Sequence, residues 1–215
     1  MNYKYKAVIF DLDDTIVESR IAKWNQHKYV AKNFYNIDLT DDILKEHWGK
    51  PFDLFISILY KHSDTIDNMR NACASTTKMF PKKLYKGSLN VVNELLGNGV
   101  KVGVLSATTI SFLKKDLEFF NFPISRFSFI QGADDTLYHK PDSKVFEPLL
   151  NYFAKQGIKN NDIVYIGDSV NDFKAADGAG INFIGVTTGL HSKKDFKNEG
   201  AKVVVNSITE VINVL

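Results

Sequence analysis

The sequence has 215 residues, of which 44% are hydrophobic and 24% charged, as is typical of globular proteins; this excludes disordered and collagen-like chains. The single cysteine, Cys73, excludes an internal disulfide and fits a reducing compartment. The 27 Lys and Arg against 25 Asp and Glu give a net charge of only +2, so no excess of positive charge indicates a nucleic-acid partner. The apolar run Ala7–Phe10 is too short for a signal peptide or a membrane span, so we expect a cytoplasmic protein without a membrane partner.

The first predicted elements are one strand and a group of helices. A continuous apolar run predicts a buried strand at Ala7–Phe10. From about Glu18 to Lys83 the pattern is helical throughout, with Thr40 as an expected N-cap and a break from Gly49 to Pro51. The expected helices of this region are roughly Glu18–Tyr35, Asp41–His47, Phe52–His62 and Thr65–Met79.

Strand and helix patterns alternate after Lys83. Helical spacing of apolar residues predicts one helix around Leu89–Leu96 and another around Val145–Phe153. Further strands are expected at Val100–Leu105, Phe127–Ile130, Ile163–Ile166, Asn182–Val186 and Val203–Val205. Alternation of this kind indicates a mostly parallel sheet with helices on both faces. We predict an α/β fold with a Rossmann-like, doubly wound core (residues 1–16 and 84–215) and an inserted all-helical cap domain (residues 17–83).

Acidic residues follow two of the predicted strands. Asp11 and Asp13 come directly after Ala7–Phe10, and in an extended segment residues two apart point to the same side. Asp168 and Asp172 likewise follow the strand that is predicted at Ile163–Ile166. Because ligands of parallel α/β sheets bind beyond the carboxyl ends of the strands, we expect these four carboxylates to share one site.

Two further motifs complete this candidate site. Ser106 stands at the end of a strand and the start of a helix, where free backbone N–H groups suit a phosphate, and Lys140 precedes another helix. The four carboxylates carry four negative charges. Lys140 offsets one of them and a divalent cation two more, and a proton on one carboxylate would remove the remaining negative charge. Oxygen ligands favour Mg²⁺ over zinc. A nucleophilic carboxylate, a carboxylic acid, a metal ion and a lysine are the parts needed for phosphoryl transfer through an aspartyl-phosphate.

These four motifs, in this order and at these strand ends, resemble those of the haloacid dehalogenase-like hydrolase superfamily over essentially the whole chain. The helical insertion is similar to the cap of the phosphoglycolate phosphatase and β-phosphoglucomutase branch. The resemblance implies that Asp11 becomes phosphorylated, and that Asp13 protonates the leaving group and then activates water. It also implies that Ser106 and the N–H of Ala107 hold the phosphate, while Lys140 stabilises its charge.

The resemblance also implies a metal site and a substrate-binding cap. Mg²⁺ would be bound by Asp11, the Asp13 carbonyl and Asp168, with Asp172 supporting these ligands. In the cap, the loop containing Lys50 could place a cation over an anionic substrate, although a solvated surface role is equally compatible with the sequence.

The sequence departs from the family pattern at several positions. Asp14 stands where glycine is usual, and Ala107 where asparagine often follows the serine. Lys23 and Phe52 replace a His and an Arg that are typical of the mutase branch, whereas the cap loop at Gly49–Pro51 resembles that of phosphoglycolate phosphatases. These departures favour a phosphatase over a mutase.

We therefore predict a Mg²⁺-dependent phosphatase that hydrolyses a small phosphorylated metabolite, such as a phosphoglycolate-like compound, a sugar phosphate or a nucleotide. The alternatives are a phosphosugar mutase that uses the same Asp11 chemistry and a non-catalytic binding module on the same fold. The absence of a heptad pattern favours a monomer over a dimer.

Overall fold

The computed structural model describes residues 3–215, which divide into two compact units. The larger unit contains the N-terminal segment up to Val17 together with Leu84–Leu215, and the smaller unit is Glu18–Lys83. Two short strands, β2 (Val17–Glu18) and β3 (Lys83–Leu84), pair where the chain passes between the units. The sequence pattern does not predict this pair, because strands of two residues are too short to show alternation.

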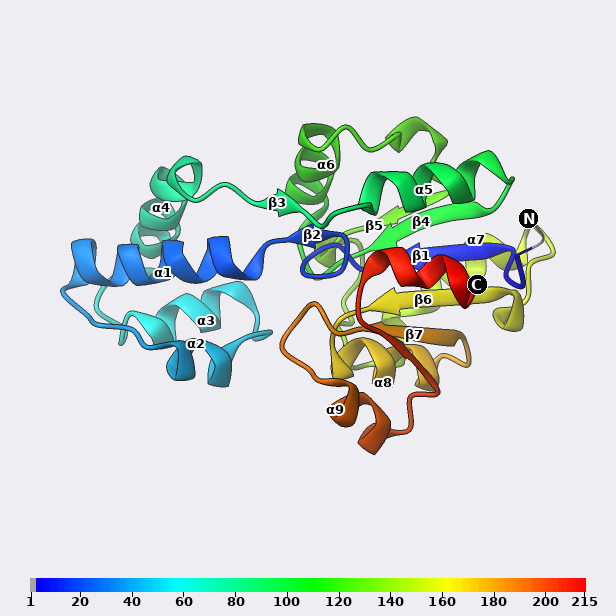
Figure 1. The fold of residues 1–215 in the computed structure, drawn as a ribbon. Coiled ribbons are helices and arrows are strands. Elements are labelled where there is room, and N and C mark those ends of the chain that lie inside the picture. Colours follow the sequence, from blue (N-terminus) through cyan, green and yellow to red (C-terminus); the bar gives the residue numbers. More distant parts are fainter. Residues whose placement is uncertain (1–2) are drawn as a thin grey trace. The chain divides into compact units, whose positions relative to one another are not determined.

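The larger unit is built on a six-stranded sheet in the order β5-β4-β1-β6-β7-β8, with all neighbouring strands parallel (Figure 1). The strands are β1 (Ala7–Phe10), β4 (Lys101–Leu105), β5 (Phe129–Gln131), β6 (Ile163–Gly167), β7 (Asn182–Val186) and β8 (Val203–Val205). Parallel neighbours need crossover connections, which here contain helices. These are α5 (Ser88–Gly97), α6 (Ile110–Phe119), α7 (Glu147–Ala154), α8 (Val170–Gly178) and α9 (Lys193–Glu199).

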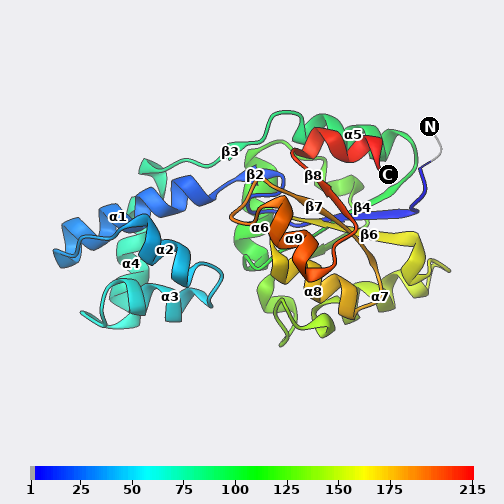
Figure 2. The same ribbon diagram turned by 60° about the horizontal axis from the view of Figure 1, so that its bottom comes forward.

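Hydrophobic cores form on both faces of the sheet because successive strand residues point to opposite sides. Val8 and Phe10 of β1 belong to a buried cluster that includes residues of α5 and α6. Ala7 and Ile9 belong to a second cluster, with residues of α7 and α8. Figure 2 shows α5 on one side of the sheet and α7 and α8 on the other. The predicted Rossmann-like, doubly wound sheet is therefore confirmed.

Some predicted boundaries are wrong by a few residues. The strand predicted at Phe127–Ile130 is β5, which begins at Phe129 because a 3₁₀ turn occupies Ile124–Arg126. The helix predicted around Val145–Phe153 begins as a 3₁₀ helix at Ser143–Phe146 and continues as α7.

The smaller unit is helical and consists of α1 (Arg20–Tyr35), α2 (Asp41–His47), α3 (Phe52–Leu59) and α4 (Ile66–Thr76). The Thr40 hydroxyl accepts a hydrogen bond from the N–H of Ile43, so this residue is the predicted N-cap of α2. Helix α3 ends three residues earlier than predicted, at Leu59, because Lys61 and His62 adopt left-handed backbone conformations with φ of 53° and 55°.

Candidate active site

The predicted nucleophile, Asp11, lies at the carboxyl end of the central strand β1. Its N–H donates to the Ile166 carbonyl of β6 at 2.8 Å, so the sheet hydrogen bonding continues through this residue and fixes its backbone. The residue as a whole is buried. Burial raises the pKa of the Asp11 carboxyl to about 7, against the lowering effect of Lys140 and with a further increase from Asp172.

Lys140 binds two carboxylates of the predicted set. Its ammonium donates to Asp11 Oδ1 at 2.7 Å, to Asp172 Oδ1 at 2.5 Å and to the Tyr165 hydroxyl at 3.0 Å. Burial alone lowers the pKa of a lysine, but the charges of Asp11 and Asp172 outweigh it and raise the pKa of Lys140 well above its usual value. Lys140 is therefore a fixed positive charge beside Asp11.

Asp172 is held in place at the first turn of α8. Its Oδ1 accepts from Lys140, and its Oδ2 accepts from the N–H and the hydroxyl of Ser169 at 3.0 and 2.6 Å. The Ser169 hydroxyl in turn accepts from the N–H of Asp172, which completes a capping box. Both carboxylate oxygens are thus occupied, and this arrangement suits the expected supporting role of Asp172.

Asp13 and Ser106 both contact Thr108, in the loop that follows β4. The Thr108 hydroxyl donates to Asp13 Oδ2 at 2.6 Å, and its N–H donates to Ser106 Oγ at 3.1 Å. Ser106 is buried, whereas the neighbouring Ala107 is exposed. The loop of β4 therefore meets the loop of β1 beyond the carboxyl edge of the sheet, as the sequence predicts.

Asp168 follows β6 and lies close to residues of the loops that follow β1 and β7. The Thr15 hydroxyl lies 3.4 Å from Asp168 Oδ1, and a Cβ added to Gly189 would lie only 1.8 Å from Asp168 Oδ2. Burial raises the pKa of Asp168 well above its usual value, and the negative charges of Asp172, Asp11 and Asp14 raise it further.

The surrounding charges fit a bound cation. Burial and the neighbouring carboxylates disfavour the ionised form of Asp168, and the positive charge of Lys140 offsets this effect only in part. Within residues 3–215, no three His, Cys, Asp or Glu side chains are grouped as in an all-side-chain metal centre. A hard cation held by Asp11, Asp168 and the Asp13 carbonyl needs only two side chains, so the residues present fit the predicted Mg²⁺.

The structure thus brings most of the predicted site residues together at one edge of the sheet. Lys50 belongs to the other, helical unit, where it is an exposed residue after α2. Four polar residues of the site are missing from the sequence-based set: Thr15, Thr108, Ser169 and Tyr165. A tyrosine within an apolar strand is a signal that could have revealed the last of these.

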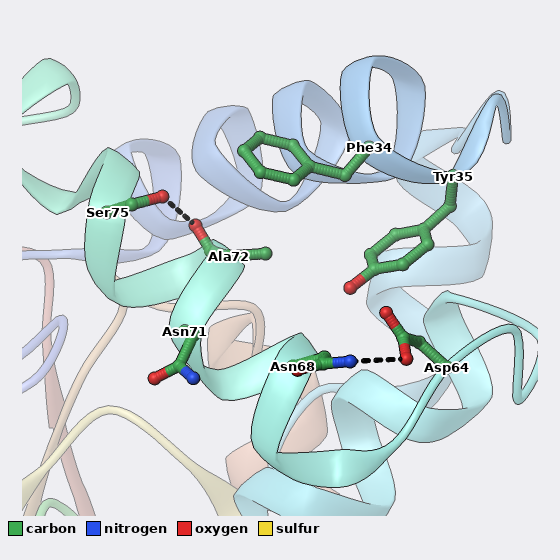
Figure 3. A pocket seen from close by; sticks show the side chains of 7 residues that line it. All are labelled: Phe34, Tyr35, Asp64, Asn68, Asn71, Ala72 and Ser75. Atoms are coloured by element: carbon green, nitrogen blue, oxygen red, sulfur yellow. Dashed lines mark hydrogen bonds between the residues drawn. The ribbon is translucent and has the colours of Figure 1, made fainter.

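The helical unit contains a separate hollow of about 330 Å³, on α1 and α4, which Figure 3 shows from close by. It is lined by Phe34, Tyr35, Asp64, Asn68, Asn71, Ala72 and Ser75. Several of its polar groups are already paired, since Asn68 donates to Asp64 and Ser75 to the Ala72 carbonyl, each at 2.8 Å. None of the predicted catalytic residues lines this hollow.

Across the described residues, no helix combines the length and apolar character needed to cross a membrane.

Comparisons with known proteins identify the family of the chain. The family model for haloacid dehalogenase-like hydrolases matches residues 8–186. A phosphoglycolate phosphatase of Yersinia pseudotuberculosis serotype I is 32% identical over 202 residues, which cover 87% of this chain and 84% of that protein.

Solved structures show the same fold. One from Bacteroides fragilis, named "putative haloacid dehalogenase-like hydrolase", superposes with a TM-score of 0.80 at 25% identity, covering 97% of this chain and 100% of that one. Another, from Thermotoga maritima and named "putative beta-phosphoglucomutase", has a TM-score of 0.80 at 22% identity and covers 97% of both chains. Since the family model spans most of the sequence, the chain belongs to the haloacid dehalogenase-like hydrolase family and, within it, resembles the phosphoglycolate phosphatase branch.

Proposed function

We propose that this protein is a Mg²⁺-dependent phosphatase that hydrolyses a small phosphomonoester through an aspartyl-phosphate on Asp11. The observation that carries the proposal is the buried ion pair between Lys140 and Asp11, 2.7 Å apart, at the carboxyl end of the central strand. A carboxylate kept next to a fixed cation in this position can attack an anionic phosphoryl group, because the cation reduces their repulsion.

In the first half-reaction, an oxygen of Asp11 forms a bond to phosphorus while the bond from phosphorus to the ester oxygen breaks. Asp13 gives its proton to the departing alkoxide, and its position is fixed by the 2.6 Å hydrogen bond from Thr108. Ser106 and the N–H of Ala107 bind the phosphoryl oxygens, and Lys140 offsets the charge on them.

In the second half-reaction, Asp13, now ionised, takes a proton from a water molecule. The water oxygen bonds to phosphorus, the bond from phosphorus to the Asp11 carboxylate breaks, and inorganic phosphate leaves. Asp11, the Asp13 carbonyl and Asp168 would hold Mg²⁺, which supplies positive charge opposite the transferring phosphoryl group.

We assign the helical unit as the cap that covers the substrate, with Lys50 as a substrate-binding cation. The substrate class is a phosphoglycolate-like compound, a sugar phosphate or a nucleotide, and the Yersinia relative favours the first of these. A mutase is the second candidate, because a solved structure named for that activity shares the fold.

The test is phosphate release from a panel of phosphomonoesters, with Mg²⁺ and with a chelator. We expect release that depends on the metal and falls at least ~10³-fold in Asp11→Asn, roughly 4 kcal/mol of transition-state stabilisation. Asp177→Asn, which changes an exposed carboxylate on α8, is the matched control and should keep full activity. Retention of most activity in Asp11→Asn would overturn the mechanism, and turnover only with a sugar bisphosphate primer would identify a mutase.

A further inference from the structure

The loop that follows β7, Thr187–Gly189, contacts the acidic loops that follow β1 and β6. The Thr188 hydroxyl donates to the carbonyl oxygen of Asp14, in the loop after β1. The next residue, Gly189, lies so close to Asp168 that a side chain at this position would collide with the carboxylate. One short segment therefore touches the turn that follows Asp13 and the predicted metal ligand Asp168.

The turn that Thr188 contacts is tightly held. Asp14 is 2% exposed and has a left-handed backbone with φ of 56°, a conformation that costs energy for a residue with a side chain. The Asp14 N–H donates to the Val17 carbonyl at 2.7 Å, and the Asp14 carbonyl accepts from the Thr188 hydroxyl. Both backbone polar groups of Asp14 are therefore hydrogen-bonded. The Tyr85 hydroxyl lies 3.2 Å from the Thr188 carbonyl and 3.5 Å from Asp14 Oδ1, which links the two loops a second time.

The strand order explains why this contact can set the geometry of the site. Strands β1 and β7 lie on either side of β6, whose loop carries Asp168. The Thr188 bond to the β1 loop and the close approach of Gly189 to Asp168 in the β6 loop therefore connect the two acidic loops through the β7 loop and limit how far they can separate. Groups outside the immediate ligand shell that orient metal ligands commonly affect affinity and activity strongly.

We propose that Thr188 is a positioning residue, which together with Gly189 fixes the spacing between the Asp13–Asp14 turn and Asp168. This inference rests on the proposed function, because it concerns the spacing of the groups that would hold Mg²⁺ and transfer the proton. Thr188 does not react; its hydroxyl keeps the Asp13 carbonyl and Asp168 at the separation that the cation requires.

The first variant is Thr188→Val, which keeps the shape of the side chain but removes the donor. We expect Mg²⁺ affinity and kcat each to fall about 10-fold or more, with KM for the phosphoester changed by less than about 2-fold. Thr188→Ser retains the hydroxyl, so its Mg²⁺ affinity and kcat should stay close to those of the wild type. The matched control is Thr187→Val, since the Thr187 side chain makes no hydrogen bond within residues 3–215.

Gly189→Ala tests the same spacing from the other loop. The added methyl group would force Asp168 or the loop to move, so we expect Mg²⁺ affinity to fall at least as far as in Thr188→Val. Metal binding is measured by calorimetry on the metal-free protein, and thermal unfolding without metal shows whether each variant remains folded.

Three results are informative. Equal Mg²⁺ affinity and kcat in Thr188→Val and Thr187→Val would overturn the positioning role. Weakened Mg²⁺ binding in Thr188→Val, in a protein whose wild type releases no phosphate from any ester, would support the role and refute the proposed phosphatase. Absence of Mg²⁺ binding in the wild-type protein would overturn both.

Discussion

The ammonium of Lys140 lies 2.7 Å from Asp11 Oδ1, although 129 positions separate the two residues in the sequence. Side-chain exposures of 10% for Lys140 and 6% for Asp11 place this pair away from bulk water. In such surroundings an unpaired charge is costly, so each residue depends on the other for its charged state. The pair also joins the loop before the 3₁₀ helix at Ser143–Phe146 to the central strand.

Lys140→Met is expected to lower kcat at least ~10²-fold, since the charge opposite the phosphoryl group is lost. It should also destabilise the metal-free fold by about 3 kcal/mol, because Asp11 and Asp172 are left buried without their cation. Phosphate release and urea unfolding measure the two effects. Lys144→Met removes a cation whose one charge contact within residues 3–215 is with the Tyr138 ring, at 4.9 Å, and should alter neither quantity appreciably. Wild-type turnover in Lys140→Met would contradict this role.

Thr108→Val is expected to slow turnover about 10-fold, because the hydroxyl that donates to Asp13 at 2.6 Å is lost and the acid is less well oriented. Steady-state kinetics would show the loss in kcat more than in KM. The neighbouring Thr109 provides the control, since its side chain does not cap α6, and Thr109→Val should behave as wild type. Equal kcat values for the two variants would exclude Thr108 from orienting Asp13.

Tyr165→Phe is expected to destabilise the protein by about 1 to 2 kcal/mol. The hydroxyl donates to the Leu105 carbonyl at 2.9 Å and lies 3.0 Å from Lys140 Nζ, so its removal leaves a buried acceptor without its partner. Chemical denaturation measures the change. Tyr152→Phe, at a position 37% exposed on α7, should cost much less. A smaller loss for Tyr165 than for Tyr152 would show that water replaces the missing hydroxyl.

The helical unit should lose stability in acid because of His27. Burial, together with the nearby charge of Lys23, lowers the pKa of His27 to about 3, and its Nδ1 lies 2.8 Å from the Tyr60 hydroxyl. The unfolded chain binds a proton below about pH 6.5 whereas the folded chain does not, so the free energy of unfolding should fall as pH decreases from about 6.5 to 3.

His27→Gln removes this contribution, and its unfolding free energy should depend less on pH than that of the wild type over the same range. The exposed His62, whose Nδ1 pairs with Ser57, is the matched control, and His62→Gln should keep the wild-type slope. Urea unfolding at several pH values measures both variants. Parallel curves for the wild type and His27→Gln would refute the assignment.

The local sequence determined the elements of this protein and indicated its candidate site. Uninterrupted apolar runs identify the buried parallel strands, and carboxylates that follow them, as Asp11 and Asp168 do, identify the edge where ligands bind. Helix periodicity and the N-cap at Thr40 likewise depend on neighbouring residues only. These features were predictable because strands and helices bury surfaces with a fixed period.

Tertiary structure alone decided which distant side chains complete the site. Tyr165 stands out as a tyrosine in an apolar strand, but its partners are defined only when α8 and the loop of Lys140 pack against it, and Thr188 carries no signal until β7 lies beside β6. The left-handed residue Asp14 is likewise held by partners distant in the sequence, Thr188 at its carbonyl and Tyr85 at its carboxylate. Hydrogen bonds between loops depend on strand order and register, and no short stretch of sequence encodes them.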